Sequence, residues 1–229
     1  MVLFVTGTNT GVGKTVFSYL LVKALLEKGV KVGYWKPVET GADPFPPDAT
    51  LLSELLKVPL EEVVSATFRL PLAPAVAQKY EGKKLDLSFL KEEFERRKER
   101  YDFLVVEGAG GLAVPIFGDY TYADFARELK LPTLVVADAR LGTINCSYLT
   151  AAFARQKGVE AVGFAFNNFT GVDPSEKDNP SVVAALTGLP VLFRIPRSRD
   201  WKRLKLEPIA VEKLLFLLGG KENPYRPTG

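Results

Sequence analysis

The sequence predicts an α/β domain with a mostly parallel central sheet and helices on both of its faces. Short apolar runs, rich in β-branched residues and phenylalanine, alternate with helical patterns along the chain. These runs are almost continuously apolar, which is typical of parallel strands that are buried on both faces of a sheet. The 229 residues, 47% of them hydrophobic, are enough for one sizeable core and short for two.

The alternation sets the order of the expected elements. Strands are expected at residues 2–5, 30–35, 103–106, 133–137, 161–166 and 191–195. Helices are expected at residues 14–28, 48–57, 88–101, 143–157, 180–187 and 209–218. The proline-bearing stretch 68–84 lacks a clear periodicity, and we expect a binding loop or a lid there. We therefore predict a single domain over residues 1–218 and a flexible tail over residues 219–229.

A glycine-rich segment, Gly7 to Thr15, leads from the first strand into the first helix. Its glycines allow backbone N–H groups to turn inward, Lys14 provides a mobile positive charge, and the Thr15 hydroxyl is a ligand for Mg²⁺. Five residues separate Gly7 from Gly13, where the usual phosphate-binding loop has four. Glycines also mark ordinary turns, but Gly-Lys-Thr at a strand-to-helix junction indicates a nucleotide site. The expected fold is therefore P-loop NTPase-like.

Polar residues follow two other strands, at the edge of a parallel sheet where ligands bind. Lys36 and Thr40 come after the second strand, and Glu107 comes directly after the third. An exposed loop lysine is usually only solvated, but the position of Lys36 beside the phosphate loop favours a role at the nucleotide. The small residues 108–111 leave room for the backbone to approach a ligand.

Thr15, Asp48 and Glu107 are a candidate set of oxygen ligands for magnesium. Mg²⁺ takes six oxygen ligands and would share them here with phosphate oxygens. Asp48 also precedes an apolar helical run, so a role as helix N-cap is an equal alternative for this residue.

The composition excludes several kinds of chemistry. The chain has no histidine and one cysteine, Cys146, which excludes histidine catalysis, histidine metal sites and an internal disulfide. The net charge of +3 is small, and no basic stripe or base-stacking motif indicates nucleic acid. No apolar run is long enough to span a membrane, and no signal-peptide pattern is visible. We expect a cytoplasmic protein that engages neither nucleic acid nor a membrane.

Taken together, these segments resemble a known family, the dethiobiotin synthetases, which use ATP and CO₂ to close a cyclic urea on 7,8-diaminononanoate. The resemblance covers nearly the whole chain and rests on motifs that occur in order. They are TGTNTGVGKT (6–15), GYWKPVETG (33–41), VEGAGGLAVP (106–115), ARLGTIN (139–145), GFAFNN (163–168) and RIPR (194–197). Such an ordered set is far more specific than a phosphate loop alone.

The resemblance implies a role for each matching residue, with Mg²⁺ as cofactor and with ATP and CO₂ or bicarbonate as co-substrates. Lys36 and Lys14 are the implied catalytic residues. The implied nucleotide-binding residues are Thr10, Gly11, Val12, Gly13, Lys14, Thr15, Asp48, Glu107, Gly108, Ala109, Gly110, Asn167, Asn168, Pro196, Arg197 and Ser198. The implied substrate contacts are Thr40, Gly110, Leu141, Gly142 and Asn145, and the implied metal ligands are Thr15, Asp48 and Glu107. Family members are homodimers, which implies that residues 141–145 reach substrate bound to the partner subunit.

Two positions depart from the family pattern. Gly11 stands where some members have an acidic residue, and Ala75 stands where a histidine is common. Both departures concern the placement of the diamine and leave nucleotide binding untouched.

Two other classes of protein remain as alternatives. One is a nucleotide-dependent switch ATPase of the partition or septum-positioning type, and the other is a small-molecule kinase. Switch proteins carry an extra lysine early in the loop, where this chain has Thr8 or Asn9. The residues leave open the choice of nucleoside triphosphate, any assembly beyond a dimer, and which amine is carboxylated first.

Overall fold

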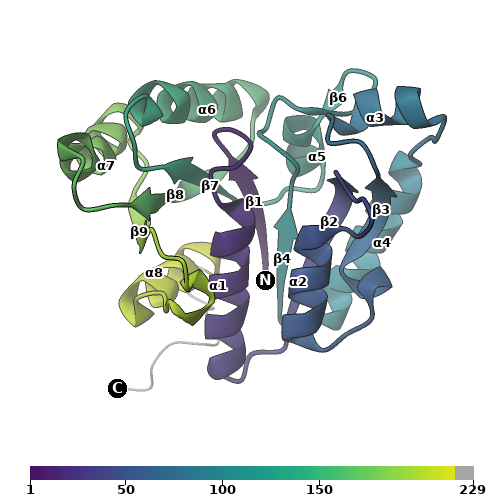
Figure 1. Cartoon of the computed structure of the whole chain (residues 1–229), viewed down its shortest axis with the longest axis horizontal. Helices are drawn as coiled ribbons and strands as arrows, with labels where there is room; N and C mark the ends of the chain where they lie inside the picture. Colours follow the sequence, from purple (N-terminus) through teal and green to yellow (C-terminus); the bar gives the residue numbers. More distant parts are fainter. Residues whose placement is uncertain (220–229) are drawn as a thin grey trace.

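A parallel sheet forms the centre of the molecule, whose computed structural model describes residues 1–219. Its strands are β1 (Val2–Gly7), β2 (Val32–Thr40), β3 (Val64–Phe68), β4 (Phe103–Glu107), β7 (Thr133–Asp138), β8 (Ala161–Phe169) and β9 (Val191–Pro196). They lie in the order β3-β2-β4-β1-β7-β8-β9, and all neighbouring pairs run parallel (Figure 1). A separate antiparallel ribbon pairs β5 (Pro115–Phe117) with β6 (Tyr120–Thr121). The predicted α/β architecture is confirmed.

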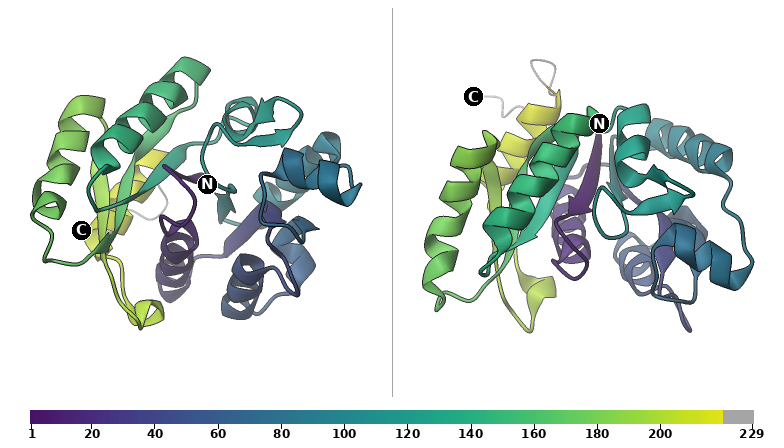
Figure 2. Two further views of the ribbon diagram at one scale, coloured as in Figure 1. Left: turned by 45° about the horizontal axis from the view of Figure 1, so that its top comes forward. Right: turned by 90° about the horizontal axis from the view of Figure 1, so that it is seen from above.

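Helices cover both faces of this sheet (Figure 2). One face carries α1 (Lys14–Glu27), α2 (Pro47–Leu56) and α8 (Pro208–Gly219). The other carries α3 (Pro74–Glu81), α4 (Leu87–Arg100), α5 (Tyr122–Glu128), α6 (Thr143–Lys157) and α7 (Pro174–Thr187). Two short 3₁₀ turns are η1 (Leu60–Glu62) and η2 (Trp201–Arg203). No helix within residues 1–219 is long and apolar enough to cross a membrane.

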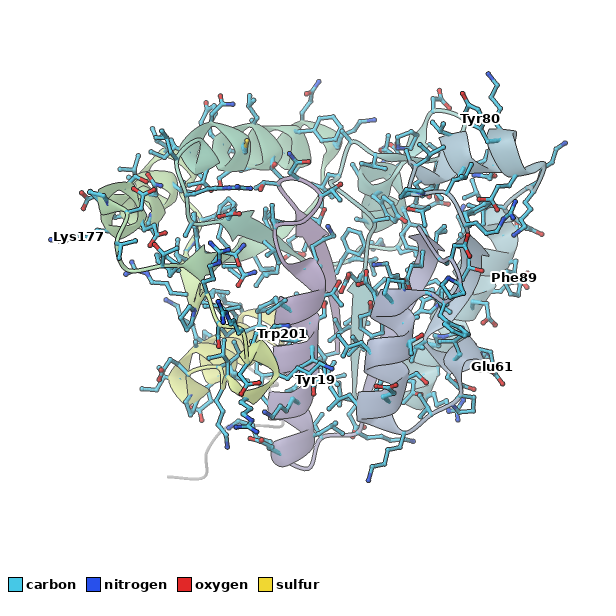
Figure 3. The ribbon with its side chains drawn as sticks, in the orientation of Figure 1. Tyr19, Glu61, Tyr80, Phe89, Lys177 and Trp201 are labelled. Atoms are coloured by element: carbon cyan, nitrogen blue, oxygen red, sulfur yellow. The ribbon has the colours of Figure 1, made fainter. Side chains whose placement is uncertain are left out.

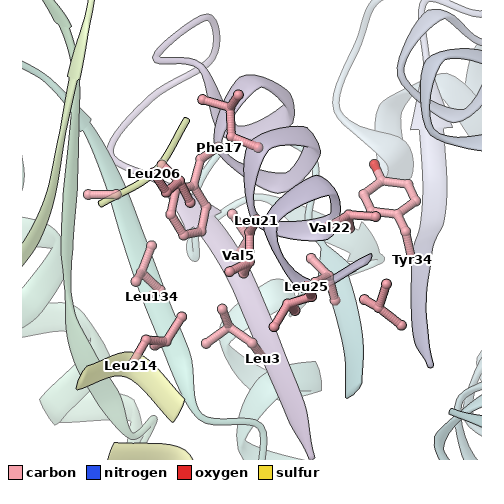
Figure 4. Close-up of a cluster of buried hydrophobic side chains, with 14 of the residues drawn as sticks. Leu3, Val5, Phe17, Leu21, Val22, Leu25, Tyr34, Leu134, Leu206 and Leu214 are labelled. Carbon is pink, nitrogen blue, oxygen red and sulfur yellow. The ribbon is translucent and has the colours of Figure 1, made fainter. Parts of the chain in front are cut away.

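The central strand β1 packs against apolar side chains on both faces, which explains its almost entirely apolar sequence. Leu3 and Val5 belong to the cluster shown in Figure 4, together with Phe17 and Leu21 of α1. Phe4 points to the opposite face and joins a second cluster. Burying each such side chain contributes about 1.5–3 kcal/mol. The phosphate loop that follows β1 therefore starts from a firmly anchored strand.

The strand β2 is longer than the sequence pattern predicts. Its pairing with β3 runs from Lys36↔Val64 to Thr40↔Phe68, so Lys36 and Thr40 lie within the strand and not after it. Pro37 interrupts the apolar pattern and lacks a backbone N–H, which argues against a strand when the sequence is considered alone. The short edge strand β3 pairs with this part of β2 and so extends it. The strand β3 was not predicted, because it carries polar residues.

Helices also form where the sequence shows no clear periodicity. The stretch 68–84, predicted to be irregular, contains α3, which begins at Pro74 because proline suits the first position of a helix. The helix α7 begins at Pro174, behind Asp173 as N-cap, and not at Pro180. The short helix α5 and the β5–β6 ribbon were not predicted either.

The chain that follows β9 returns across α1. Tyr19 of α1 and Trp201 of η2 lie edge to face, with ring centres 5.2 Å apart (Figure 3). This contact packs the segment that follows Pro196 against α1, the helix that begins at the end of the phosphate loop. Gly219, predicted as part of a tail, ends α8, and the rest of that predicted tail, residues 220–229, lies outside the described residues.

Candidate active site

A cavity of about 430 Å³ opens between the phosphate loop, the end of β2, the start of α2 and the loops before α3 and β5. It is lined by Thr10, Gly11, Gly13, Lys14, Thr15, Lys36, Thr40, Asp48, Pro71, Leu72, Ala73, Pro74, Ala109, Gly110 and Val114. The cavity therefore lies beyond the carboxyl ends of the parallel strands, where such sheets bind ligands. It brings together most of the site residues predicted around the phosphate loop.

The phosphate loop is fastened to β8 through Asn167. Gly13 has a φ of +95°, and a Cβ atom placed there would lie 1.8 Å from Asn167 Nδ2, so only glycine fits. The buried Asn167 amide donates to the backbone oxygen of Val12 at 3.1 Å. Asn167, predicted to border adenine, thus fastens the loop in this structure. The first turn of α1 has no acidic residue, which leaves its N–H groups and dipole available to an anion.

The lysine at the end of the loop is largely enclosed. Only 7% of Lys14 is exposed, and burial lowers the pKa of its ammonium, while the carboxylates of Glu107 and Asp48 oppose that shift. A phosphate group in the cavity would supply the missing negative charge. The arrangement is that of a cation prepared for an anionic ligand.

Lys36 lies between two carboxylates. Its Nζ donates to Glu107 Oε1 at 3.1 Å and to Asp48 Oδ2. The register explains the first contact, because Trp35 pairs with Val106 and the next residues of β2 and β4 are Lys36 and Glu107. Burial alone would lower the pKa of Lys36, but Glu107 and Asp48 raise it above its usual value. The ammonium therefore stays charged inside the protein.

Asp48 does not cap the helix α2, because Glu39 does so. The Asp48 carboxylate can therefore turn to Lys36 and the cavity. The carboxylate of Glu39 accepts from the backbone N–H of Asp48 at 2.8 Å and of Ala49 at 2.9 Å. The N-cap residue of α2 is Pro46, which makes no side-chain cap. The alternative of Asp48 as N-cap is therefore wrong. Glu39, which sequence reasoning missed, takes that role. Burial raises the pKa of its carboxyl above the ordinary value, and the charge of Lys36 offsets part of that shift.

The predicted metal ligands can be tested for fit to Mg²⁺. Thr15 Oγ1 lies 2.8 Å from Glu107 Oε1, close to the distance of about 2.9 Å between neighbouring oxygens of an octahedral Mg²⁺ site. No group of three or more His, Cys, Asp or Glu side chains suited to a metal occurs within residues 1–219. The residues therefore fit a cation that is completed by phosphate oxygens, not one held by the protein alone.

A second hollow of about 310 Å³ adjoins the loop on the other side. It is lined by Gly11, Asp138, Arg140, Asn168, Thr170, Asp173, Glu176 and Arg197. Pro196 ends β9, and the backbone N–H of Arg197 donates to the oxygen of Phe169 at 2.7 Å. Three residues of the predicted nucleotide set, Gly11, Asn168 and Arg197, therefore line this hollow. Ser198 follows Arg197 in the sequence.

The three substrate residues predicted from 141–145 do not line the cavity of their own chain. Leu141 is 82% exposed, and Gly142 and Asn145 are exposed at the start of α6. Their contact with substrate stays a prediction.

One part of the cavity wall is apolar. Pro71, Leu72, Ala73 and Pro74 form it together with Val114. The first four fall in the stretch predicted as a binding loop or lid, whereas Val114 was missed because a lone valine in a loop carries no signal. Ala75 follows Pro74 directly in α3, and Gly11 borders both hollows.

The loop 108–111 closes the site from the side of β4. A Cβ atom on Gly108 would lie 2.9 Å from the ring of Phe4, so this residue supports the loop and does not line the cavity. Ala109 and Gly110 do line it. Gly110 accepts from the backbone N–H of Gly7 at 3.3 Å, which joins this loop to the start of the phosphate loop.

The sheet and its loop define a P-loop nucleotide-binding domain. A family model described as an AAA domain matches residues 1–204. A ParA family ATPase from Chlorobium tepidum TLS aligns with a TM-score of 0.55 at 14% identity, covering 96% of this chain and 90% of that one. A chain of the MinC:MinD cell division protein complex from Aquifex aeolicus aligns with a TM-score of 0.57 at 15% identity. The alignment covers 88% of this chain and 84% of that one. At these identities the likeness concerns the fold alone.

Relatives with higher identity define the particular family. The ATP-dependent dethiobiotin synthetase BioD of Aquifex aeolicus (strain VF5) is 46% identical over 200 residues, 87% of this chain and 90% of that protein. The protein of the same name from Bacillus licheniformis is 40% identical over 205 residues, 86% of each chain. The chain therefore belongs to the dethiobiotin synthetase family. The predicted family and the predicted class, an ATP-dependent ligase, are confirmed.

Proposed function

We propose that this chain carboxylates 7,8-diaminononanoate with CO₂ and closes the product to dethiobiotin, with conversion of ATP to ADP and phosphate. The observation that carries the proposal is one cavity that joins three different surfaces. The phosphate loop suits a triphosphate, the cluster of Lys36 with Asp48 and Glu107 suits amines and a carbamate, and the wall at Pro71–Pro74 suits an aliphatic chain. A diamine with an alkyl tail can meet all three at once.

The reaction divides into three balanced steps. One substrate amine attacks CO₂ and loses a proton, which gives a carbamate. A carbamate oxygen then attacks the γ-phosphorus of ATP, which releases ADP and gives a carbamic-phosphoric mixed anhydride. The second amine attacks the carbonyl carbon of that anhydride, loses a proton and expels phosphate as the ring closes. No side-chain nucleophile is needed, which agrees with a chain that has no histidine.

The residues of the cavity stabilise negative charge during these steps. Lys14 faces the transferring phosphoryl group, and Lys36 faces the carbamate, with loop amides of 109–110 beside them. Mg²⁺ held by Thr15 and Glu107, with Asp48 nearby, would neutralise charge on the phosphate oxygens. Asp48 and Glu107 also keep the Lys36 ammonium in place.

We further propose that the active unit is a homodimer. The exposed start of α6, with Leu141, Gly142 and Asn145, would then meet the tail of substrate bound to the partner subunit. A cytoplasmic location without a nucleic acid partner remains a prediction from composition.

A nucleotide-switch ATPase is the less favoured alternative. Proteins of that kind share the fold at 14–15% identity, whereas the dethiobiotin synthetases share 40–46% of the sequence. The loop also has Thr8 and Asn9 where such switches carry an additional lysine.

An oxygen-isotope experiment tests the mixed anhydride. Short incubations with ¹⁸O-labelled bicarbonate, ATP and the diamine should give phosphate that carries one labelled oxygen and a cyclic product that carries another. Phosphate without label in the presence of labelled product would contradict the transfer of a carbamate oxygen to phosphorus.

A further inference from the structure

Two oxygen atoms beside the cavity are buried and lack a regular hydrogen bond. Tyr34 Oη and Glu107 Oε2 have no partner at regular hydrogen-bonding geometry within the described part of the chain. Their residues are 1% and 0% exposed, so water does not replace the missing partner. Buried polar atoms of native proteins are rarely left unsatisfied, and such exceptions require an explanation.

The sheet register directs these two side chains toward each other. Tyr34 pairs with Val105 of β4, and Glu107 is two residues further along the same strand, on the same face as Val105. Aromatic side chains can reach a diagonal neighbour of this kind across paired strands. Figure 4 shows the Tyr34 ring beside Val22, at the edge of the apolar cluster. Lys36, two residues after Tyr34 on β2, lies on the same face of the sheet and contacts Glu107.

The electrostatics of Tyr34 agree with this placement. Its pKa is raised well above the ordinary value, first by burial and then by the charges of Glu107, Asp48 and Glu39, with a further contribution from hydrogen bonding to Glu107. A phenol carries one O–H and an ionised carboxylate oxygen only accepts, so Tyr34 Oη is the donor in any contact with Glu107.

Glu107 needs a donor on its second oxygen. Its Oε1 accepts from Thr15 Oγ1 at 2.8 Å and from Lys36 Nζ at 3.1 Å, and both contacts lie on the cavity side. A carboxylate held through one oxygen alone can rotate, which would move Oε1 away from Thr15. A donor on Oε2 prevents that rotation.

We propose that Tyr34 is a positioning residue, whose hydroxyl donates to Glu107 Oε2 and keeps Glu107 Oε1 aimed at Thr15 and at the cation of a bound nucleotide. Outer-shell hydrogen bonds of this kind typically change metal affinity by about 10–100-fold. The inference rests on the cation site of the proposed function, but not on the diamine or on CO₂. The sequence motif alone does not indicate it, because Tyr34 lies in the apolar part of β2.

The test is the binding of Mn²⁺ to the protein with ADP, followed by electron paramagnetic resonance without diamine or bicarbonate. Tyr34→Phe keeps the ring and removes the donor, and we expect its affinity for Mn²⁺ to fall about 10-fold while the affinity for ADP without metal is unchanged. Tyr101→Phe is the matched control, because its ring packs against Gly33 on the same strand and should leave Mn²⁺ binding unchanged. Unchanged Mn²⁺ affinity in Tyr34→Phe, with or without a lower melting temperature, overturns the proposal.

A second measurement keeps the test valid if Tyr34→Phe does not fold. Replacement of Tyr34 by 3-fluorotyrosine retains the ring and the hydroxyl, and its ¹⁹F resonance should shift when Mg²⁺ is added to the ADP complex. A resonance that does not move would overturn the proposal. Both experiments omit the proposed substrates, so a failed synthetase reaction and a failed role of Tyr34 are distinguishable.

Discussion

At the scale of single residues, the site depends on one buried cation between two carboxylates. Lys36 contacts Asp48 and Glu107, and the side chains of Lys36 and Glu107 are only 5% and 0% exposed. Removing one partner of a buried ion pair leaves an uncompensated charge, which typically costs about 3–5 kcal/mol. Lys36 therefore contributes to stability as well as to the stabilisation of developing negative charge.

Replacement of Lys36 by alanine tests both contributions. We expect Lys36→Ala to fold with a lower melting temperature, to bind ATP, and to lose about 10²–10³-fold in turnover, since it removes one preorganised contact to the reacting groups. Lys91→Ala is the control, because Lys91 lies outside the cavity and its ion pair with Glu128 is partly exposed; such a pair is worth about 1 kcal/mol or less. Turnover of Lys36→Ala close to that of the unchanged protein would contradict the role.

A pair of glycine substitutions tests the geometry of the phosphate loop. Gly13→Ala places Cβ 1.8 Å from Asn167 Nδ2 at a φ of +95°, so we expect ATP binding to be lost. Gly11→Ala shares the left-handed conformation, with a φ of +77°, but meets no atom within 4 Å. It should therefore cost only about 1–2 kcal/mol of backbone strain and retain binding. Calorimetric titration with ATP compares them, and equal affinity of the two variants would show that the contact with Asn167 does not matter.

At the scale of elements, β2 does more than the sequence pattern suggests. It supplies Lys36 and Thr40 to the cavity, and its Glu39 caps α2 from outside the helix. The position of Asp48 thus depends on a contact between a strand and the first turn of a helix.

Removal of this cap should displace α2. We expect Glu39→Ala to lower the free energy of unfolding by about 1–2 kcal/mol, the usual cost of losing an N-cap, and to lower activity because Asp48 loses its fixed position. The matched variant Glu54→Ala removes an exposed carboxylate of the same helix and should change stability by less than about 0.5 kcal/mol. Denaturant unfolding of both variants gives the comparison. Equal stability of Glu39→Ala and Glu54→Ala would refute the capping role.

Strongly periodic elements could be predicted from the sequence, and the others could not. The helix 143–157 matches α6 at both ends, because its pattern is long and a glycine flanks each end. The edge strand β3 and the extension of β2 escape prediction because each depends on the other as pairing partner. The ribbon β5–β6 has too few residues to show a period.

The same distinction applies to the site. Lys14, Thr15 and Glu107 could be located from short segments, since a loop between strand and helix and an acid at a strand end are local signals. The contact of Asn167 with Val12 joins positions 155 residues apart, and no local pattern encodes it. Glu39 and the wall residue Val114 likewise acquire their roles only through tertiary contacts.

At the scale of the whole molecule, exposed apolar residues lie just before α6 and within its first half. Leu141, Tyr148 and Leu149 are 82%, 47% and 56% exposed. These residues lie at or near the segment that we propose to reach the partner subunit. Exposed apolar side chains that gather in this way mark interaction surfaces in many proteins.

The proposed dimer can be tested through these residues. We expect sedimentation velocity to show a dimer at micromolar concentration, and Leu149→Arg to shift it toward monomer and to lower activity. Leu186→Arg, at a residue that is 53% exposed on α7, is the control that should remain dimeric. A monomer with full activity would contradict the proposed assembly.

One cavity, in this proposal, couples ATP cleavage to ring closure of a diamine. Mass spectrometry of the product after incubation with Mg²⁺, ATP, bicarbonate and 7,8-diaminononanoate, with phosphate release followed in the same sample, checks this coupling. We expect one dethiobiotin for each phosphate released, and no product without bicarbonate. Phosphate release that is independent of the diamine and yields no cyclic product would refute the coupling and favour a switch ATPase.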